Sequence, residues 1–488
     1  MSFRESTVVI IDTGRSSIKA GQGIYELLRT PTVDIPARVA RRKNAPNPRK
    51  EGENGAEADP NKPTLRPSSY LVGPQIDEAL ANGEELDIFW PFEGSNEKTG
   101  GVSDWTQAEA LWKYVLFTGL KIRRTQNESP VMLSLPATLS RDSHARVAQV
   151  FFERLNVAGL SVVERPILQL YAANAISGIV IDIHNTCTDI TPIYDSAVQL
   201  AATVLAPLGV QHCEAYLAHL LATNSTLVAT LGVPPAELRP TLLRLARMLW
   251  KNGHIKVPLA GDVAPPEEED EGVTNIAAVV VAGREKAVVE ANNKKKNTKN
   301  STAAERAREA EIAALDLLTV EFEGKQVTVG KDRHRFCEPL FEPSILRNVE
   351  GMQETLKDHK SIFGLQEWVN HAAQGVDYVW RHTLYDAVFV TGELSAMDKT
   401  LSYAVHSRLL SYVLKTEEPA NDAQPKAVRT VRVPDYFAEY REKGDGLAGF
   451  LGGSIVAKLT FCDSSARNYV SKNDYSARGP AALLEYMV

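Results

Sequence analysis

Apolar and polar positions along this chain form two kinds of segment that alternate. Short apolar runs rich in Val and Ile predict buried β-strands at residues 7–11, 131–134, 178–182, 387–390 and 430–433. Longer segments with apolar residues every three or four positions predict helices at residues 105–117, 143–155, 167–175, 214–221 and 399–414. Because strands and helices alternate, we expect an α/β protein whose central strands are mostly parallel.

One segment departs from that alternation. Residues 318–330 read LTVEFEGKQVTVG, and their apolar residues recur at every second position on both sides of Glu323 and Gly324. This spacing around a Gly-containing turn predicts an antiparallel β-hairpin.

Two regions lack the apolar periodicity altogether. Residues 37–67 are rich in Pro, Gly, Asn and charge, so we expect a mobile, disordered insertion there. Residues 259–315 hold an acidic run and a basic run and close with a segment typical of a capped helix, so we expect a second insertion.

The composition narrows the class of protein. The 488 residues carry a formal net charge of −7, which argues against nucleic-acid binding over the whole surface. The basic stretches at 38–50 and 294–299 are expected to be solvated loops, with nuclear import or contact with DNA phosphate as the alternative. No apolar run is long enough to span a membrane, and the four cysteines are too scattered to indicate zinc or a disulfide framework.

Candidate chemistry begins after the first predicted strand, where Asp12 and Gly14 are followed by Lys19. A strand that ends in Asp-x-Gly, followed by a turn and a Lys, can bind phosphate through backbone N–H groups while the Asp holds a metal ion. Alone, this pattern favours an ordinary tight hairpin with a surface Lys. However, the strand at 178–182 also ends in an aspartate, Asp182, which offers a second hairpin of the same type.

With this second strand, the chain resembles the actin family. The resemblance continues, in order, through residues 133–136, 170–172, 191–194, 335–344, 451–457, 470–475 and 479–480. It implies a ribonuclease H-like fold of two lobes with a nucleotide cleft between them. The lobes are expected at residues 1–172 and 173–450, with residues 451–488 returning to the first lobe.

The resemblance also implies a phosphate site, of which only vestiges remain. The matching positions are Asp12, Gly14, Lys19, Asp182 and Gly392. Around them the sequence departs from actin: Arg15 and Ser16 replace a small pair, His184 to Thr186 replace a glycine-containing turn, and Glu393 replaces a glycine of the base-binding turn. A bulky side chain hinders the close approach of backbone to phosphate that glycine allows.

Two further departures concern hydrolysis. Arg165 and Asp189 stand where actins have the Gln and His that position the attacking water. Neither residue can reproduce that pair, and a carboxylate repels a triphosphate. We therefore expect no catalytic residue, no metal and no cofactor; retention of ATP as a structural ligand is the alternative.

What remains in such a protein is a scaffold. The family has a groove between its lobes that accepts a partner helix, and its lining here is expected to include Tyr171, Ile176, Val456 and Leu459. The alternative is that Val456 and Leu459 simply face the core.

The chain most resembles the ninth class of fungal actin-related proteins, which belongs to the SWI/SNF and RSC chromatin-remodelling complexes. That resemblance implies a non-catalytic nuclear subunit that binds the helicase-SANT-associated helix of the motor ATPase as a heterodimer with a second actin-related protein. It also implies contact with other remodeller subunits and indirect association with nucleosomes or DNA. The alternatives are an ATP-binding cytoskeletal protein that forms or caps filaments, and an ATPase of the wider sugar kinase and chaperone superfamily.

Overall fold

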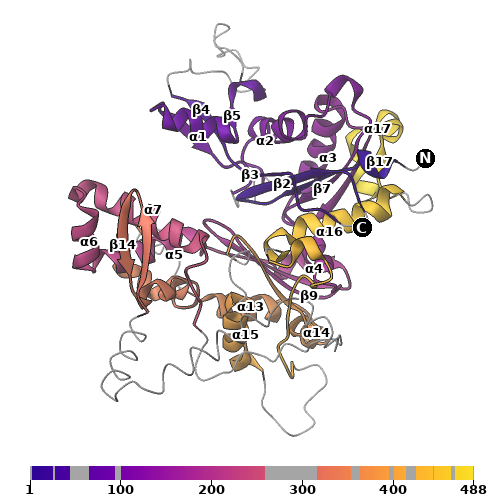
Figure 1. The fold of residues 1–488 in the computed structure, drawn as a ribbon. Coiled ribbons are helices and arrows are strands. Elements are labelled where there is room, and N and C mark those ends of the chain that lie inside the picture. Colours follow the sequence, from indigo (N-terminus) through magenta and orange to yellow (C-terminus); the bar gives the residue numbers. More distant parts are fainter. Residues whose placement is uncertain are drawn as a thin grey trace, which may run out of the picture.

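The computed structural model describes most of the chain. The described residues are 3–25, 28–43, 65–93, 101–258, 316–352, 363–394, 400–413, 425–442, 444–462 and 468–486. Figure 1 shows two lobes, each built around a sheet, with the first and last described segments together in one of them. The predicted insertion at 259–315, with its helix, lies outside the described residues.

The first lobe contains a six-stranded sheet. Its order is β17 (Val470–Ser471), β8 (Gly159–Glu164), β7 (Pro130–Leu135), β1 (Val9–Thr13), β2 (Ser17–Gln22) and β3 (Val33–Pro36). Strands β1, β7 and β8 run parallel, whereas β1, β2 and β3 form an antiparallel meander. Every residue of β1 and β7 is buried, as is typical of parallel strands covered on both faces.

The second lobe repeats this plan. Its sheet has the order β11 (Ala197–Val198), β10 (Thr188–Tyr194), β9 (Gly178–Ile183), β15 (Val388–Gly392) and β16 (Thr430–Val431), and β12 (Val204–Ala206) also pairs with β10. Again the first strand forms an antiparallel hairpin with the second and pairs in parallel with a later one. The two sheets therefore place β1 and β9, with their hairpins, at equivalent positions, and the expected parallel central strands are confirmed.

The predicted helices are also present. In the first lobe they are α2 (Trp105–Lys113), α3 (Arg141–Gln149) and α4 (Arg165–Ala172); in the second they are α5 (Val210–Ala222) and α15 (Thr400–Leu409). The second lobe also contains four helices that the sequence pattern does not predict: α6 (Ser225–Leu231), α7 (Pro235–Lys251), α13 (Leu365–Gln374) and α14 (Arg381–Tyr385). The side chain of Asp104 caps α2 by accepting a hydrogen bond from the backbone N–H of Thr106 at 2.7 Å. Among the described residues, no helix combines the length and the apolarity that crossing a bilayer requires.

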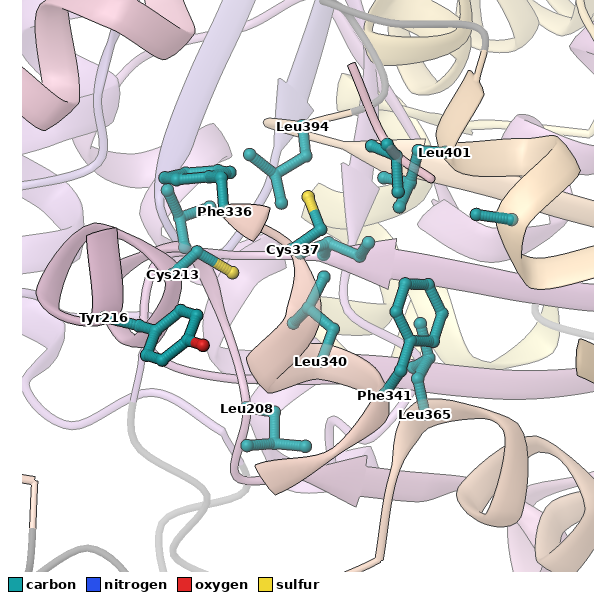
Figure 2. Close-up of a cluster of buried hydrophobic side chains, with 14 of the residues drawn as sticks. Leu208, Cys213, Tyr216, Phe336, Cys337, Leu340, Phe341, Leu365, Leu394 and Leu401 are labelled. Atoms are coloured by element: carbon teal, nitrogen blue, oxygen red, sulfur yellow. The ribbon is translucent and has the colours of Figure 1, made fainter. Parts of the chain in front are cut away.

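A large apolar core holds the second lobe together. Figure 2 shows part of it, where Leu208, Cys213 and Tyr216 meet the segment that carries Phe336, Cys337 and Leu340. Both cysteines are buried and free. The predicted hairpin is confirmed as β13 (Leu318–Phe322) and β14 (Lys325–Val329), and its turn residues Glu323 and Gly324 have φ of 50° and 76°. Positive φ at both turn residues matches a tight two-residue hairpin.

The end of the chain returns to the first lobe. Helix α16 (Ala448–Ala457) packs on α4, β1 and β7, and β17 pairs with β8. The helix α17 (Lys472–Arg478) follows β17, and Figure 1 shows these elements beside the N-terminal strands. The lobe boundaries expected from the sequence stay a prediction.

The expected insertion at 37–67 is wrong at its start. Val39–Arg42 form strand β4, which lies between β5 (Leu71–Val72) and β6 (Leu86–Phe89) in a three-stranded sheet next to α1 (Pro74–Ala81). Val39 and Ala40 are fully buried, while the neighbouring Arg42 is paired with Glu84. Burial of these two apolar residues and charge pairing of the arginines make a strand from a segment whose overall composition is polar. Residues 44–64 lie outside the described residues.

Candidate functional site

The carboxylates of Asp12 and Asp182 lie at equivalent places in the two sheets, on β1 and β9. Arg165, the first residue of α4, connects them: its Nε donates to Asp12 Oδ1 at 2.8 Å and its Nη1 donates to Asp182 Oδ2. All three side chains are buried. One guanidinium therefore bridges a carboxylate from each lobe.

Further hydrogen bonds hold these carboxylates in place. Ser134 Oγ donates to Asp12 Oδ1 at 2.6 Å, and Gln169 Nε2 donates to Asp182 Oδ2 at 2.7 Å. Burial by itself raises the pKa of Asp12, but the charges of Arg165 and Lys19 and the bond from Ser134 hold that pKa below its usual value. Asp12 is thus ionised and has charged partners inside the protein.

A second ion pair connects the two hairpins. Arg15, in the turn between β1 and β2, donates from Nε to Asp189 Oδ2 at 2.5 Å and from Nη2 to Asp189 Oδ1 at 3.0 Å. Its Nη1 donates to the carbonyl of Phe92 in the first lobe at 3.4 Å. The side chain of Arg15 is 3% exposed and that of Asp189 is 17% exposed. This is the two-pronged geometry in which Arg binds carboxylate most strongly.

The turn between β9 and β10 contributes two more contacts. His184 Nε2 lies 3.1 Å from Asp189 Oδ2, and burial lowers the pKa of His184. Thr186 Oγ1 donates to Glu93 Oε1 of the first lobe at 2.6 Å. Burial by itself raises the pKa of Asp189, but Arg15 and His184 outweigh it and hold that pKa well below its usual value. His184 therefore supports the carboxylate that Arg15 binds.

The remaining positions predicted from the sequence lie around this cluster. Lys19 Nζ donates to Ser17 Oγ at 2.7 Å and adds positive charge near Asp12. Gly14 approaches the backbone closely, since a Cβ there would lie 3.0 Å from the carbonyl oxygen of Ser17. Gly392 has a φ of +98°, and a Cβ there would lie 2.2 Å from the carbonyl oxygen of Ile183. A glycine is therefore required at position 392 by the contact between β15 and β9.

Little space is left between the hairpins. The cavity at this point is lined by Gly14, Arg15, Pro136, Arg165, Asp182, His184 and Asp189 among other residues, and its volume is about 20 Å³. That volume has room for roughly one water molecule. In the described part of the chain, no group of three or more His, Cys, Asp and Glu side chains is arranged to hold a metal ion.

The four residues predicted to line a partner groove lie at the ends of two adjacent helices. Helices α4 and α16 approach so closely that a Cβ on Gly452 would lie 1.8 Å from the carbonyl oxygen of Leu168. Ile176, which follows α4, is 57% exposed, and Leu459, which follows α16, is 61% exposed. Tyr171 and Val456 are half-buried. Leu459 therefore does not face the core.

Both helices also begin at the charged cluster. Arg165 is the first residue of α4, and a Cβ on Gly449 in the first turn of α16 would lie 2.6 Å from Asp12 Oδ1. Each helix thus runs from the buried ion pairs to the exposed apolar residues, and the two sites are structurally continuous.

In the sequence, Arg15, Arg165 and Asp189 stand out only as departures from the actin pattern. The structure brings each of them to a partner, and the roles of His184 and Gln169 had no signal in the sequence. One signal was available: Arg15 and Asp189 are opposite charges at positions that lie face to face in two hairpins of the same fold.

Comparisons with known proteins agree on one family. The family model described as Actin matches residues 3–486. The SWI/SNF and RSC complexes subunit arp9 of Schizosaccharomyces pombe is 26% identical, and the alignment covers 99% of each chain. Actin-related protein 7 of Arabidopsis thaliana is 22% identical over 97% of this chain and 98% of its own, and Actin-related protein 4 of the same organism is 23% identical over 79% and 77%.

Proposed function

Because the chain belongs to the actin family, with the two-lobed α/β fold that the resemblance predicted, we propose that it is a non-catalytic scaffold subunit of a nuclear chromatin-remodelling complex of the SWI/SNF and RSC type. The relative of that name aligns with it along nearly its whole length. One observation carries the non-catalytic part of the proposal: the guanidinium of Arg165 binds the carboxylates of Asp12 and Asp182 at once.

The charges of the cluster support this proposal. The three cationic side chains Arg15, Lys19 and Arg165 lie near three aspartates, Asp12, Asp182 and Asp189, and Glu93 adds a further negative charge near Arg15. A metal ion that binds the carboxylates of Asp12 and Asp182 must displace the guanidinium of Arg165. Arg165 is then a buried cation without a partner. The cleft therefore binds neither metal nor nucleotide in this arrangement and hydrolyses none.

The available space supports the same conclusion. A cavity of about 20 Å³ is far smaller than a triphosphate requires. Arg15 spans the cleft by reaching Asp189, so phosphate enters only if that buried ion pair opens. The proposed subunit therefore binds no cofactor in this cleft.

A groove at the ends of α4 and α16 is the proposed contact for the partner. Ile176 and Leu459 are exposed aliphatic side chains, and Tyr171 and Val456 lie half-buried beside them on the two helices. An amphipathic helix buries its apolar face in such a groove. We propose that the helicase-SANT-associated helix of the motor ATPase binds here and that a second actin-related protein binds the same helix as the heterodimer partner.

Affinity purification from nuclear extract, with identification of the co-purifying chains, tests this function. We expect a remodeller ATPase and a second actin-related protein, and we expect both to be lost with Leu459→Asp. Leu317→Asp is a matched control, because Leu317 is 58% exposed and immediately precedes the β13–β14 hairpin, which lies away from α16 in Figure 1. Recovery of filament-associated proteins without a remodeller ATPase contradicts the proposal.

A further inference from the structure

We propose that the Arg15–Asp189 and Arg165–Asp182 ion pairs form a latch that holds the two lobes closed without a nucleotide. This inference rests on the proposed absence of nucleotide and not on the proposed complex. Arg15 connects the hairpin of the first sheet to Asp189 of the second, and Arg165, on the helix between the lobes, connects Asp12 of the first sheet to Asp182 of the second. Separation of the lobes must therefore break the Arg15–Asp189 pair and pull Asp12 and Asp182 away from their shared guanidinium.

The first half of the latch is anchored on both sides of the cleft. Arg15 is fixed in its own lobe by the carbonyl of Phe92 while it binds both oxygens of Asp189. Asp189 is in turn held by His184. Because both side chains have a second partner, little conformational freedom is lost when the pair forms, which favours the closed state.

The second half lies at the base of the cleft, where the chain passes between the lobes. Arg165 begins the helix that leads from β8 to β9, and both it and Gln169 donate to Asp182. A third contact, from Thr186 to Glu93, closes the outer part of the same cleft. Contacts at the base and at the mouth together resist both rotation and opening of the lobes.

The latch also bears on the groove. Helix α4 carries Arg165 at its start and Tyr171 near its end, while α16 begins beside Asp12 and carries Val456 near its end. A closed latch therefore keeps the helices that form the groove in one arrangement before any partner binds.

Distance measurements between two spin labels test the latch in the full-length protein. Suitable positions are Ala81 at the end of α1 and Ala229 on α6, which are exposed and lie in different lobes, on the same side of the molecule in Figure 1. The labels are attached to Ala81→Cys and Ala229→Cys. Cys462, the half-buried cysteine, is replaced by Ser; the other three cysteines are buried.

We expect the otherwise native protein to give one narrow distance distribution that Mg²⁺ and ATP leave unchanged. Arg15→Ser and Asp189→Ser should each shift the distribution to longer distances, and the double variant should shift it no further than either single variant. Arg244→Ser is the matched control, because its partner Glu323 lies in the same lobe; circular dichroism verifies that every variant is folded.

The outcomes separate the latch from the proposed function. Unchanged distributions for both single variants, with no effect of ATP, overturn the latch alone. A native distribution that is broad and narrows only when ATP is added overturns both the latch and the proposed absence of nucleotide binding.

Discussion

The charged cleft and the proposed partner groove lie at opposite ends of the same two helices, α4 and α16, and their side chains differ in chemistry. In the cleft, Arg165 and Arg15 are buried and each is bound to carboxylates of the same chain. In the groove, Ile176 and Leu459 leave apolar surface exposed to solvent. A buried charge is stable only with a partner, whereas an exposed apolar side chain gains free energy when something covers it.

This difference indicates which of the two sites is available for binding. In the cleft, side chains of the chain itself occupy the positions where a ligand would bind, and an added ligand has to compete with them. In the proposed groove, Ile176 and Leu459 are exposed, so no described residue covers them. Variants that remove a partner from the cleft should therefore destabilise the fold, and variants in the groove should affect binding alone.

The largest effect is expected for Arg165→Leu. This change leaves the buried carboxylates of Asp12 and Asp182 without their cation, and removal of one member of a buried ion pair typically costs about 3–5 kcal/mol of unfolding free energy. Urea unfolding measures the loss. Arg244→Leu removes an arginine from a half-exposed ion pair and should cost at most about 1 kcal/mol; equal losses in the two variants refute the account of the cleft.

Gly452→Ala tests the close contact of α4 and α16. A Cβ at position 452 would lie 1.8 Å from the backbone oxygen of Leu168, so the two helices must move apart. Overpacking of this kind typically costs about 1–3 kcal/mol, and the same unfolding measurement applies. In the neighbouring Gly453→Ala the nearest atom is Cγ2 of Ile10 at 3.1 Å, so the loss should be smaller; a larger loss there contradicts the predicted geometry.

Glu164, next to Arg165, should give the protein a pH dependence opposite to that of the cleft aspartates. Burial raises the pKa of Glu164 to about 7, so its contribution to stability is greatest in acid and falls as the pH rises from about 4.5 to about 7. The pKa values of Asp12 and Asp189 are lowered, so their contribution is present above the unfolded value of 3.8 and is lost as the pH falls through the folded values.

Unfolding of Glu164→Gln across this pH range isolates the first effect. Above pH 7, where native Glu164 is charged, we expect the variant to be more stable than the native protein by on the order of 1 kcal/mol. Near pH 4 the difference should vanish. An equal difference at both pH values shows that the effect does not arise from ionisation of Glu164.

The smallest effect on stability is expected for Leu459→Asp. The side chain is 61% exposed, so the unfolding free energy should change by no more than about 0.5 kcal/mol. Loss of the remodeller ATPase in the purification from nuclear extract, with unchanged unfolding, is the expected pair of results. If the variant retains the ATPase, Leu459 is not part of the partner contact.

The sequence pattern predicts the elements well because apolar periodicity is a local property. It is less accurate where polar residues are buried: the predicted first strand, 7–11, ends before Asp12, whereas β1 includes Asp12 and Thr13. Their polar atoms are paired with Ser134 and Trp112, which lie more than ninety residues away in the chain. Hydrogen bonds between residues so far apart form only in the folded protein, so a local sequence pattern cannot predict them.

The candidate site shows the same limit. Asp12, Gly14 and Asp182 were identified because they match a motif, and the structure brings them together. The ion pair of Arg15 with Asp189 joins positions 174 residues apart, and only the meeting of the two hairpins reveals it. For the same reason β4 was mistaken for part of an insertion, since the acidic partners of its arginines belong to other elements.

Ion pairs within the chain close the cleft, and titration of the native protein with a fluorescent ATP analogue in the presence of Mg²⁺ tests this closure. We expect no saturable binding, even at millimolar concentrations of the analogue. Saturable binding with micromolar affinity contradicts it, because a nucleotide held that tightly must displace Arg165 and Arg15 from their carboxylates.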